Sequence, residues 1–354
     1  MTTRKSNKTQ GQTAGKDGFG VHNEWGKLRE VLVGSNMNDT VPRWSPDWGR
    51  YFHKTTLVGG GSSVKEDMQK NAGKIYSDIN PVWYEACQRE TEGLVKALTD
   101  HGVTVHRPRR LTEEERLREP VGHFQQYARD PQLVIGTHII ETNIRMIYRN
   151  KEHLGYDKVL QTFVKKHPEY QHVRMPMIAA EPAGNTPEEW DNDPRLMLEG
   201  GDTFVMGKDI LVGISSLASS PSGVEWLNRY LGAEGFRVHG VPLTDEWLHL
   251  DCIFAVVRPG LAIVVKSALR GGMNAFPSFM RDWEFIEATT DEAHKMHTNT
   301  LCLEPGVVVM PEDAERLIGE VEKRKATVVP IPFAGTGSIG GGIRCSTHPL
   351  WREE

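Results

Sequence analysis

The sequence predicts an α/β protein in which one unit, a β-hairpin followed by a helix and a short strand, occurs five times. Paired apolar runs are interrupted by glycine-containing turns, amphipathic segments follow these pairs, and short β-branched runs that often end at proline come next. A unit of this kind cannot bury its own faces, so it must stack against its neighbours. Five such units are expected to close into a ring.

The hairpins are predicted from their turns. Apolar runs meet at Gly-Thr, Gly-Lys and Pro-Gly pairs, residue types that favour tight turns. The four hairpins are expected in LVIGTHIIETNI (133–144), FVMGKDILVG (204–213), IFAVVRPGLAIVV (253–265) and LCLEPGVVVM (301–310). The first unit is expected to begin with LREVLVG (28–34).

The helices and returning strands follow in the same order. A helix around 82–102 has Trp83, Cys87, Leu94 and Leu98 on one face, and Gly102 ends it. Further helices are expected at 151–167, 222–232 and 311–325, and one around 271–282 in the fourth unit. The returning strands are expected at 103–108, 172–176, 236–242, 283–288 and 327–332.

Composition limits the possible partners and the domain organisation. The chain has 354 residues and a formal net charge of -5, which argues against nucleic-acid and anionic-membrane partners. No apolar run approaches the length of a membrane span, and the polar N-terminus lacks the features of a signal peptide. Residues 1–18 are expected to be a disordered tail, and residues 19–354 a single catalytic domain.

Cysteine usage singles out one residue. Cys87, Cys252 and Cys302 lie in apolar patterns and are expected to be buried, whereas Cys345 lies in the glycine-rich stretch GSIGGGIRCST. No CxxC pair supports a zinc site, and free thiols in a reducing, cytoplasmic compartment are expected. Cys345 is either an incidental thiol on a flexible tail or a nucleophile presented by a glycine loop.

Polar residues recur at the unit boundaries. Asp130 precedes the second hairpin, Glu199 the third, and His249 with Asp251 the fourth, while Cys345 stands where the ring would close. Equivalent positions in a closed ring converge on its axis, which predicts a central site. Each motif also has an alternative interpretation. ARD (128–130) could be an ordinary surface pair, LEGGD (198–202) a plain turn, and HLD (249–251) a structural histidine or a set of metal ligands.

These residue types favour a cationic substrate. A thiol needs a base or a nearby cation to become a nucleophilic thiolate, and His249 can move protons. Three carboxylates around the same site would raise the thiol pKa unless the substrate brings positive charge. A planar guanidinium brings that charge and binds carboxylates in a bidentate manner.

Motifs along nearly the whole chain carry a resemblance. NEWGKLREVLVG (23–34), GVTVHRP, ARD followed by VIGTHIIE, LEGGDTF, SGVEWLNRYLG, HLDCIF and GGGIRCST resemble the amidinotransferases of the guanidino-group-modifying superfamily. The resemblance implies a five-bladed α/β propeller whose blades are ββαβ units. It further implies that Cys345 attacks the guanidino carbon, that His249 transfers protons, and that Asp130, Glu199 and Asp251 hold the guanidinium.

The resemblance also implies a reaction. The amidino group of L-arginine would move to Cys345, releasing L-ornithine, and then to an acceptor amine, without metal or organic cofactor. Arg270 and Asn299 are candidate binding residues for the donor carboxylate, because the chain departs from glycine-forming members in this region. Glycine, lysine, a polyamine and an aminocyclitol remain possible acceptors.

Two other functions remain open, and two further expectations accompany the reaction. A hydrolase of the same superfamily would use water in the second step, and a non-catalytic propeller would only bind a cationic ligand or a partner protein. The aromatic and glycine-rich segment 42–82 is expected to cover the site. A homodimer is the favoured assembly.

Overall fold

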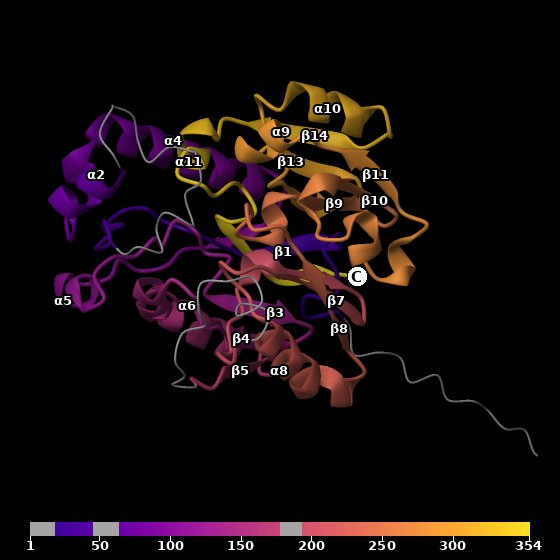
Figure 1. The fold of residues 1–354 in the computed structure, drawn as a ribbon, viewed down its shortest axis with the longest axis horizontal. Coiled ribbons are helices and arrows are strands. Elements are labelled where there is room, and N and C mark those ends of the chain that lie inside the picture. The colour runs from indigo at the N-terminus through magenta and orange to yellow at the C-terminus, as the bar shows by residue number, and fades with distance from the viewer. Residues whose placement is uncertain (1–17, 45–63, 178–192) are drawn as a thin grey trace, which may run out of the picture.

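The computed structural model describes residues 18–44, 64–177 and 193–354. Within these residues, strands β1 to β15 form five three-stranded sheets. The prediction of a five-bladed α/β propeller is confirmed, with one sheet in each blade (Figure 1). Part of the predicted tail and the middle of the predicted cover, 45–63, lie outside the described residues.

Every blade has the same strand order. The central strand pairs antiparallel with one neighbour and parallel with the other. The blades are β15 (Thr347–Glu353), β1 (Lys27–Val33) and β2 (Thr104–His106); β3 (Gln132–Ile135), β4 (His138–Glu141) and β5 (Gln171–Arg174); β6 (Thr203–Met206), β7 (Asp209–Ile214) and β8 (Arg237–Pro242); β9 (Phe254–Arg258), β10 (Leu261–Val264) and β11 (Glu284–Glu287); and β12 (Leu301–Glu304), β13 (Val307–Pro311) and β14 (Thr327–Ile331).

The four predicted hairpins form at the predicted turns. In the turns between β6 and β7, β9 and β10, and β12 and β13, Gly207, Gly260 and Gly306 have φ near +80°, a conformation that residues with a Cβ rarely adopt. Strands β3, β6 and β10 are buried along their whole length, which matches their near-continuous apolar sequence.

The two ends of the described chain complete the first blade together. β15 pairs antiparallel with β1 from Lys27–Glu353 to Val33–Thr347. This pairing takes the place of the hairpin found in the other four blades. The expectation that the ring closes onto its first unit just after Cys345 is therefore confirmed.

Helices lie on the outside of the ring (Figure 1). The main ones are α4 (Pro81–Asp100), α6 (His153–Lys166), α8 (Pro221–Leu231) and α10 (Glu315–Glu322). α8 illustrates why they form: Ser220 caps its N-terminus through the Gly223 amide, and Pro221 opens the first turn. Shorter helices are α2 (Val64–Asn71), α3 (Tyr76–Ile79), α5 (Glu113–Leu117), α9 (Thr290–His294) and α11 (Ala334–Gly337).

The fourth blade lacks the expected α-helix at 271–282. Two 3₁₀ turns, Gly272–Ala275 and Ser278–Met280, occupy this stretch instead. Gly271 and Gly272 adopt positive φ values of 92° and 62°, and Pro277 cannot donate a helical hydrogen bond.

In the described part of the chain, no helix is both long and apolar enough to span a membrane.

Candidate active site

The ring brings one position of every blade to its axis. Asp130, Gly201, Cys252, Asn299 and Cys345 each lie two residues before the first strand of a blade hairpin, or before β15 in the first blade. All five residues are buried. The predicted convergence of unit boundaries is thus found in the structure, and Asn299 is the contribution of the fifth blade.

Cys345 is held from two sides. The Asn299 amide nitrogen donates to the Cys345 Sγ at 3.1 Å, and the Asn299 Oδ1 accepts from the Cys345 backbone N–H at 3.0 Å. On the other side, the Asp251 Oδ2 lies 3.5 Å from the sulfur. Burial, and then the negative charge of Asp251, raises the pKa of the Cys345 thiol well above its ordinary value. Without a cationic ligand, this thiol is protonated.

The glycines before Cys345 allow close packing of its loop. A Cβ on Gly341 would lie 2.2 Å from the Tyr127 ring, and one on Gly342 would lie 2.6 Å from the Asn299 Cβ. Gly340 has a φ of +93°. The glycine run therefore lets a neighbouring aromatic ring and Asn299 approach the backbone, which excludes the interpretation of a flexible tail.

His249 lies between two carboxylates. Its Nε2 is 2.9 Å from the Glu199 Oε2, and its Nδ1 is 3.8 Å from the Asp130 Oδ1. Burial lowers the pKa of His249, but the carboxylates of Asp130, Glu199 and Asp202 outweigh it and raise this pKa to about 10. The imidazole is therefore a cation at neutral pH and can act as an acid.

Arg149 fixes Asp130, and this contact was not anticipated from the sequence. The Arg149 Nη1 is 2.7 Å from the Asp130 Oδ2, and its Nη2 is 2.9 Å from the Glu152 Oε2. Burial raises the pKa of Asp130, but His249 and Arg149 outweigh it and hold this pKa below its ordinary value. Asp130 is therefore ionised in the site. The run RMIYRNKE gives no pattern that separates Arg149 from its basic neighbours.

Asp251 is fixed by a second buried arginine. The Arg344 Nη1 lies 3.2 Å from the Asp251 Oδ2, and its Nη2 lies 3.3 Å from the Glu24 Oε2. The Arg344 guanidinium also lies over the Phe204 ring, 3.7 Å from its centre. Glu24 comes from the NEW stretch near the N-terminus, so this network ties that stretch to the residue before Cys345.

Asp202 supports the turn that carries His249. Its Oδ1 accepts from the Leu250 N–H at 2.9 Å, and its Oδ2 accepts from the Ser219 N–H at 3.2 Å. Burial raises the pKa of Asp202 to about 7. The second acidic residue of LEGGD is thus a positioning residue, a role that its place in a predicted turn did not reveal.

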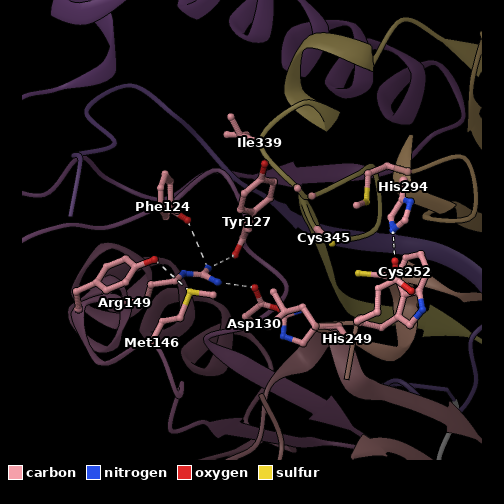
Figure 2. A pocket seen from close by; sticks show the side chains of 17 residues that line it. Phe124, Tyr127, Asp130, Met146, Arg149, His249, Cys252, His294, Ile339 and Cys345 are labelled. Carbon is pink, nitrogen blue, oxygen red and sulfur yellow. Dashed lines mark hydrogen bonds and ion pairs between the residues drawn. The ribbon is translucent and has the colours of Figure 1, made fainter. Parts of the chain in front are cut away.

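A pocket that is open to solvent lies beside these residues. Figure 2 shows Cys345 between Tyr127 and His249, with Arg149 and Met146 on one side and His294 on the other. Asp130, His249 and Cys345 line the pocket directly. Glu199, Asp251 and Asn299 contact these lining residues from behind.

Arg270 is not brought to this pocket. It lies at the surface, where its Nη2 is 3.4 Å from the Asp245 Oδ1, and it does not line the pocket. The other candidate for the donor carboxylate, Asn299, is completely buried against Cys345. The geometry thus supports Asn299 as a residue that orients the nucleophile.

A metal ion is a second chemical possibility for part of this site. Ligand atoms of Asp130, Glu199 and His249 lie within 4.8 Å of one another. A metal needs a neutral imidazole, whereas the pKa of about 10 keeps the His249 ring protonated at neutral pH. Asp130 already pairs with Arg149. The donor set therefore fits proton transfer and cation binding better than metal binding.

A propeller with a buried thiol on its axis and several carboxylates nearby agrees with the class that the sequence resembles, the proteins that modify guanidino groups. The family model described as arginine deiminase matches residues 117–284 and 280–352. The chain belongs to the arginine deiminase family.

Known relatives agree with the resemblance drawn from the sequence. Inosamine-phosphate amidinotransferase 1 of Streptomyces glaucescens is 26% identical, with 94% of this chain and 96% of the relative covered. L-arginine:L-lysine amidinotransferase of Pseudomonas savastanoi pv. phaseolicola is 22% identical, covering 94% and 93%. The structure of SxtG, an amidinotransferase from Microseira wollei in the saxitoxin biosynthetic pathway, matches with a TM-score of 0.77 at 21% identity, covering 95% and 98%.

Proposed function

We propose that this protein is an amidinotransferase that takes the amidino group of L-arginine onto Cys345 and passes it to an acceptor amine. One observation carries the proposal: the Cys345 Sγ lies 3.5 Å from the Asp251 Oδ2 in a pocket that Asp130 and His249 also line. Carboxylates beside a nucleophile suit a substrate whose electrophilic carbon belongs to a cation. The amidinotransferase relatives support the same reaction.

Substrate binding would activate the thiol. Asp251 and the buried environment raise the pKa of Cys345, so the free enzyme holds a protonated, unreactive sulfur. A guanidinium bound between Asp130 and Asp251 neutralises their charge and places a cation beside the sulfur, which lowers the thiol pKa. The thiol proton is released to solvent, so the nucleophilic thiolate forms when the donor is present.

In the first half-reaction the Cys345 sulfur adds to the guanidino carbon, and the bond from that carbon to the Nε of arginine breaks. The protonated His249, held by Glu199, gives its proton to the departing nitrogen. Ornithine leaves, and a cationic amidino group remains on the sulfur. Asp130 and Asp251 are suited to hold this group as they held the guanidinium.

In the second half-reaction His249 acts as a base. The acceptor amine gives a proton to the neutral imidazole, its nitrogen bonds to the amidino carbon, and the bond from that carbon to the sulfur breaks. His249 ends protonated and Cys345 ends as a thiolate that recovers a proton. The free enzyme is restored without metal or organic cofactor.

A hydrolase is the second candidate, because the matching family model is described as arginine deiminase. The two candidates share the attack of Cys345 on the guanidino carbon. If ornithine leaves and water then attacks the amidino-cysteine, the products are ornithine and urea. If ammonia leaves in place of ornithine and water attacks that intermediate, the product is citrulline.

The test begins with intact-protein mass spectrometry after mixing with labelled L-arginine. We expect an amidino adduct on the wild-type protein and none on Cys345→Ala. Ornithine release that depends on an added amine, with a matching guanidino product, supports the transferase. Citrulline, or ornithine with urea, produced at a rate that no amine alters supports hydrolysis. Turnover by Cys345→Ala would refute both.

A further inference from the structure

The polar groups around His249 and Cys345 form one polar part of the pocket. Glu246 and His294 form a second polar end. The His294 Nε2 lies 3.2 Å from the Glu246 Oε1, and the His294 ring stacks on Trp247 with ring centres 4.8 Å apart. His294 lies across Cys345 from Arg149 (Figure 2). Glu246, Trp247 and Leu248 directly precede His249, so one loop carries both Glu246 and the proton-transfer group.

The Glu246 carboxylate at this end is accessible to a ligand. The Glu246 side chain is 45% exposed, and its carboxylate retains acceptor capacity beyond the contact with His294. Among the described lining residues, Arg149 is the only lysine or arginine, and its guanidinium is committed to Asp130 and Glu152. The described part of this end therefore offers an anion to a ligand.

Part of the pocket lining is apolar. Leu248, Met296 and Ile339 line the pocket together with the His249 and Cys345 side chains. Such walls suit a short chain of methylene groups, since burying these groups is favourable and needs no hydrogen-bond partner. The pocket thus combines a reacting centre, apolar lining and an accessible carboxylate.

Building on the proposed function, we propose that the acceptor is a diamine and that Glu246 binds its distal ammonium group. One nitrogen lies beside His249, loses its proton to the imidazole and forms the new bond to the amidino carbon as the bond to Cys345 breaks. The other nitrogen stays protonated and is paired with Glu246 in a charge-assisted contact. An acceptor that ends in a carboxylate would meet like charge at the same place.

Two acceptors of four carbons each test this inference directly. Putrescine ends in an ammonium and γ-aminobutyrate ends in a carboxylate, while both carry a primary amine that can react. We expect the wild-type enzyme to have a kcat/KM for putrescine at least about fivefold above that for γ-aminobutyrate, the scale of one partly exposed ion pair. Glu246→Gln should reduce this preference, and Glu246→Lys should reverse it.

Asp245 provides the matched control. It is the neighbouring acid on the same loop, is exposed, contacts Arg270 and does not line the pocket. Asp245→Lys makes the same change in net charge, and we expect it to leave the acceptor preference unchanged. An equal shift in Asp245→Lys would reveal a general charge effect and overturn the assignment to Glu246.

Failure of this inference is distinguishable from failure of the proposed function. The arginine-derived adduct on Cys345 is measured separately, before any acceptor is added. If the adduct forms but γ-aminobutyrate is the better wild-type acceptor, or Glu246→Lys leaves the preference unchanged, the diamine assignment is wrong. If no adduct forms, the proposed function itself is wrong.

Discussion

The Asn299 side chain holds Cys345 at two points, with its Oδ1 on the backbone N–H at 3.0 Å and its Nδ2 on the sulfur at 3.1 Å. The backbone N–H needs an acceptor, which fixes the amide orientation and leaves the NH₂ group facing the sulfur. The same nitrogen donates to the Asp251 carbonyl at 3.0 Å. One side chain thus sets the position of the nucleophile relative to the carboxylate beside it.

Replacing Asn299 changes the thiol in a specific way. Asn299→Asp adds negative charge beside the sulfur, so the thiol pKa should rise further. The pH midpoint for alkylation of Cys345 by iodoacetamide, followed by mass spectrometry, should move above the wild-type midpoint. Asn228→Asp, the same change at an exposed position of α8, should leave it unmoved. A midpoint that is unchanged or lower in Asn299→Asp would contradict this role.

His249 should make stability depend on pH in one direction. Its pKa is about 10 in the folded protein and 6.5 ordinarily, so the folded state binds this proton more tightly. The stabilisation is complete below about pH 6.5 and is lost as the pH rises towards 10. In urea unfolding, the stability of wild type relative to His249→Gln should therefore fall across this range. A difference that stays constant or grows with pH would show that the imidazole is not held as a cation.

Gly201 should be required for the position of His249. A Cβ at Gly201 would lie 2.6 Å from the His249 Nδ1 and 3.0 Å from the Asp130 Oδ1. Gly201→Ala should lower kcat by about 10²-fold, because small displacements of reacting groups have effects of that size. Gly93→Ala is the control, since a Cβ at that site in α4 meets nothing within 4 Å. Near-wild-type kcat in Gly201→Ala would exclude the packing constraint.

Arg149 should be required for stability as well as for the site. Arg149→Met leaves the Asp130 and Glu152 carboxylates buried without their partner, which should cost about 3–5 kcal/mol in the free energy of unfolding. Arg149→Lys keeps the charge but loses the planar fork, so it should cost less. Urea unfolding measures the free energy of unfolding of both variants. Arg229→Met removes an exposed pair on α8 and should change little. Similar small losses in all three variants would be inconsistent with a buried ion-pair network.

Sequence patterns predicted the blades well where local chemistry determines them. The turns at Gly207, Gly260 and Gly306 need positive φ, and the segments around them alternate between apolar strands and amphipathic helices, so their positions could be inferred. The fourth blade could not be predicted in the same way. Its apolar positions between 271 and 282 resemble a helix, but Gly271, Gly272 and Pro277 favour separate 3₁₀ turns.

The site was predictable where its residues stand at unit boundaries. Asp130, Glu199, His249, Asp251 and Cys345 were found by that rule, and the structure brings all of them together. Arg149 and Arg344 were not found, because a buried ion pair depends on side chains that meet only after the blades assemble. Arg270 was proposed from its charge and its position after the fourth hairpin, and it lies at the surface with Asp245.

The pairing of β15 with β1 places a condition on when the protein can react. Cys345 lies two residues before β15, and its partners Asn299, Asp251 and Asp130 come from three earlier blades. During synthesis the sulfur therefore leaves the ribosome after every group that controls it, and it is positioned only when the last strand meets one of the first. A growing chain therefore has no positioned nucleophile. Deletion of β15 would leave the Cys345 thiol unpositioned and unreactive, while most of the blades could still fold.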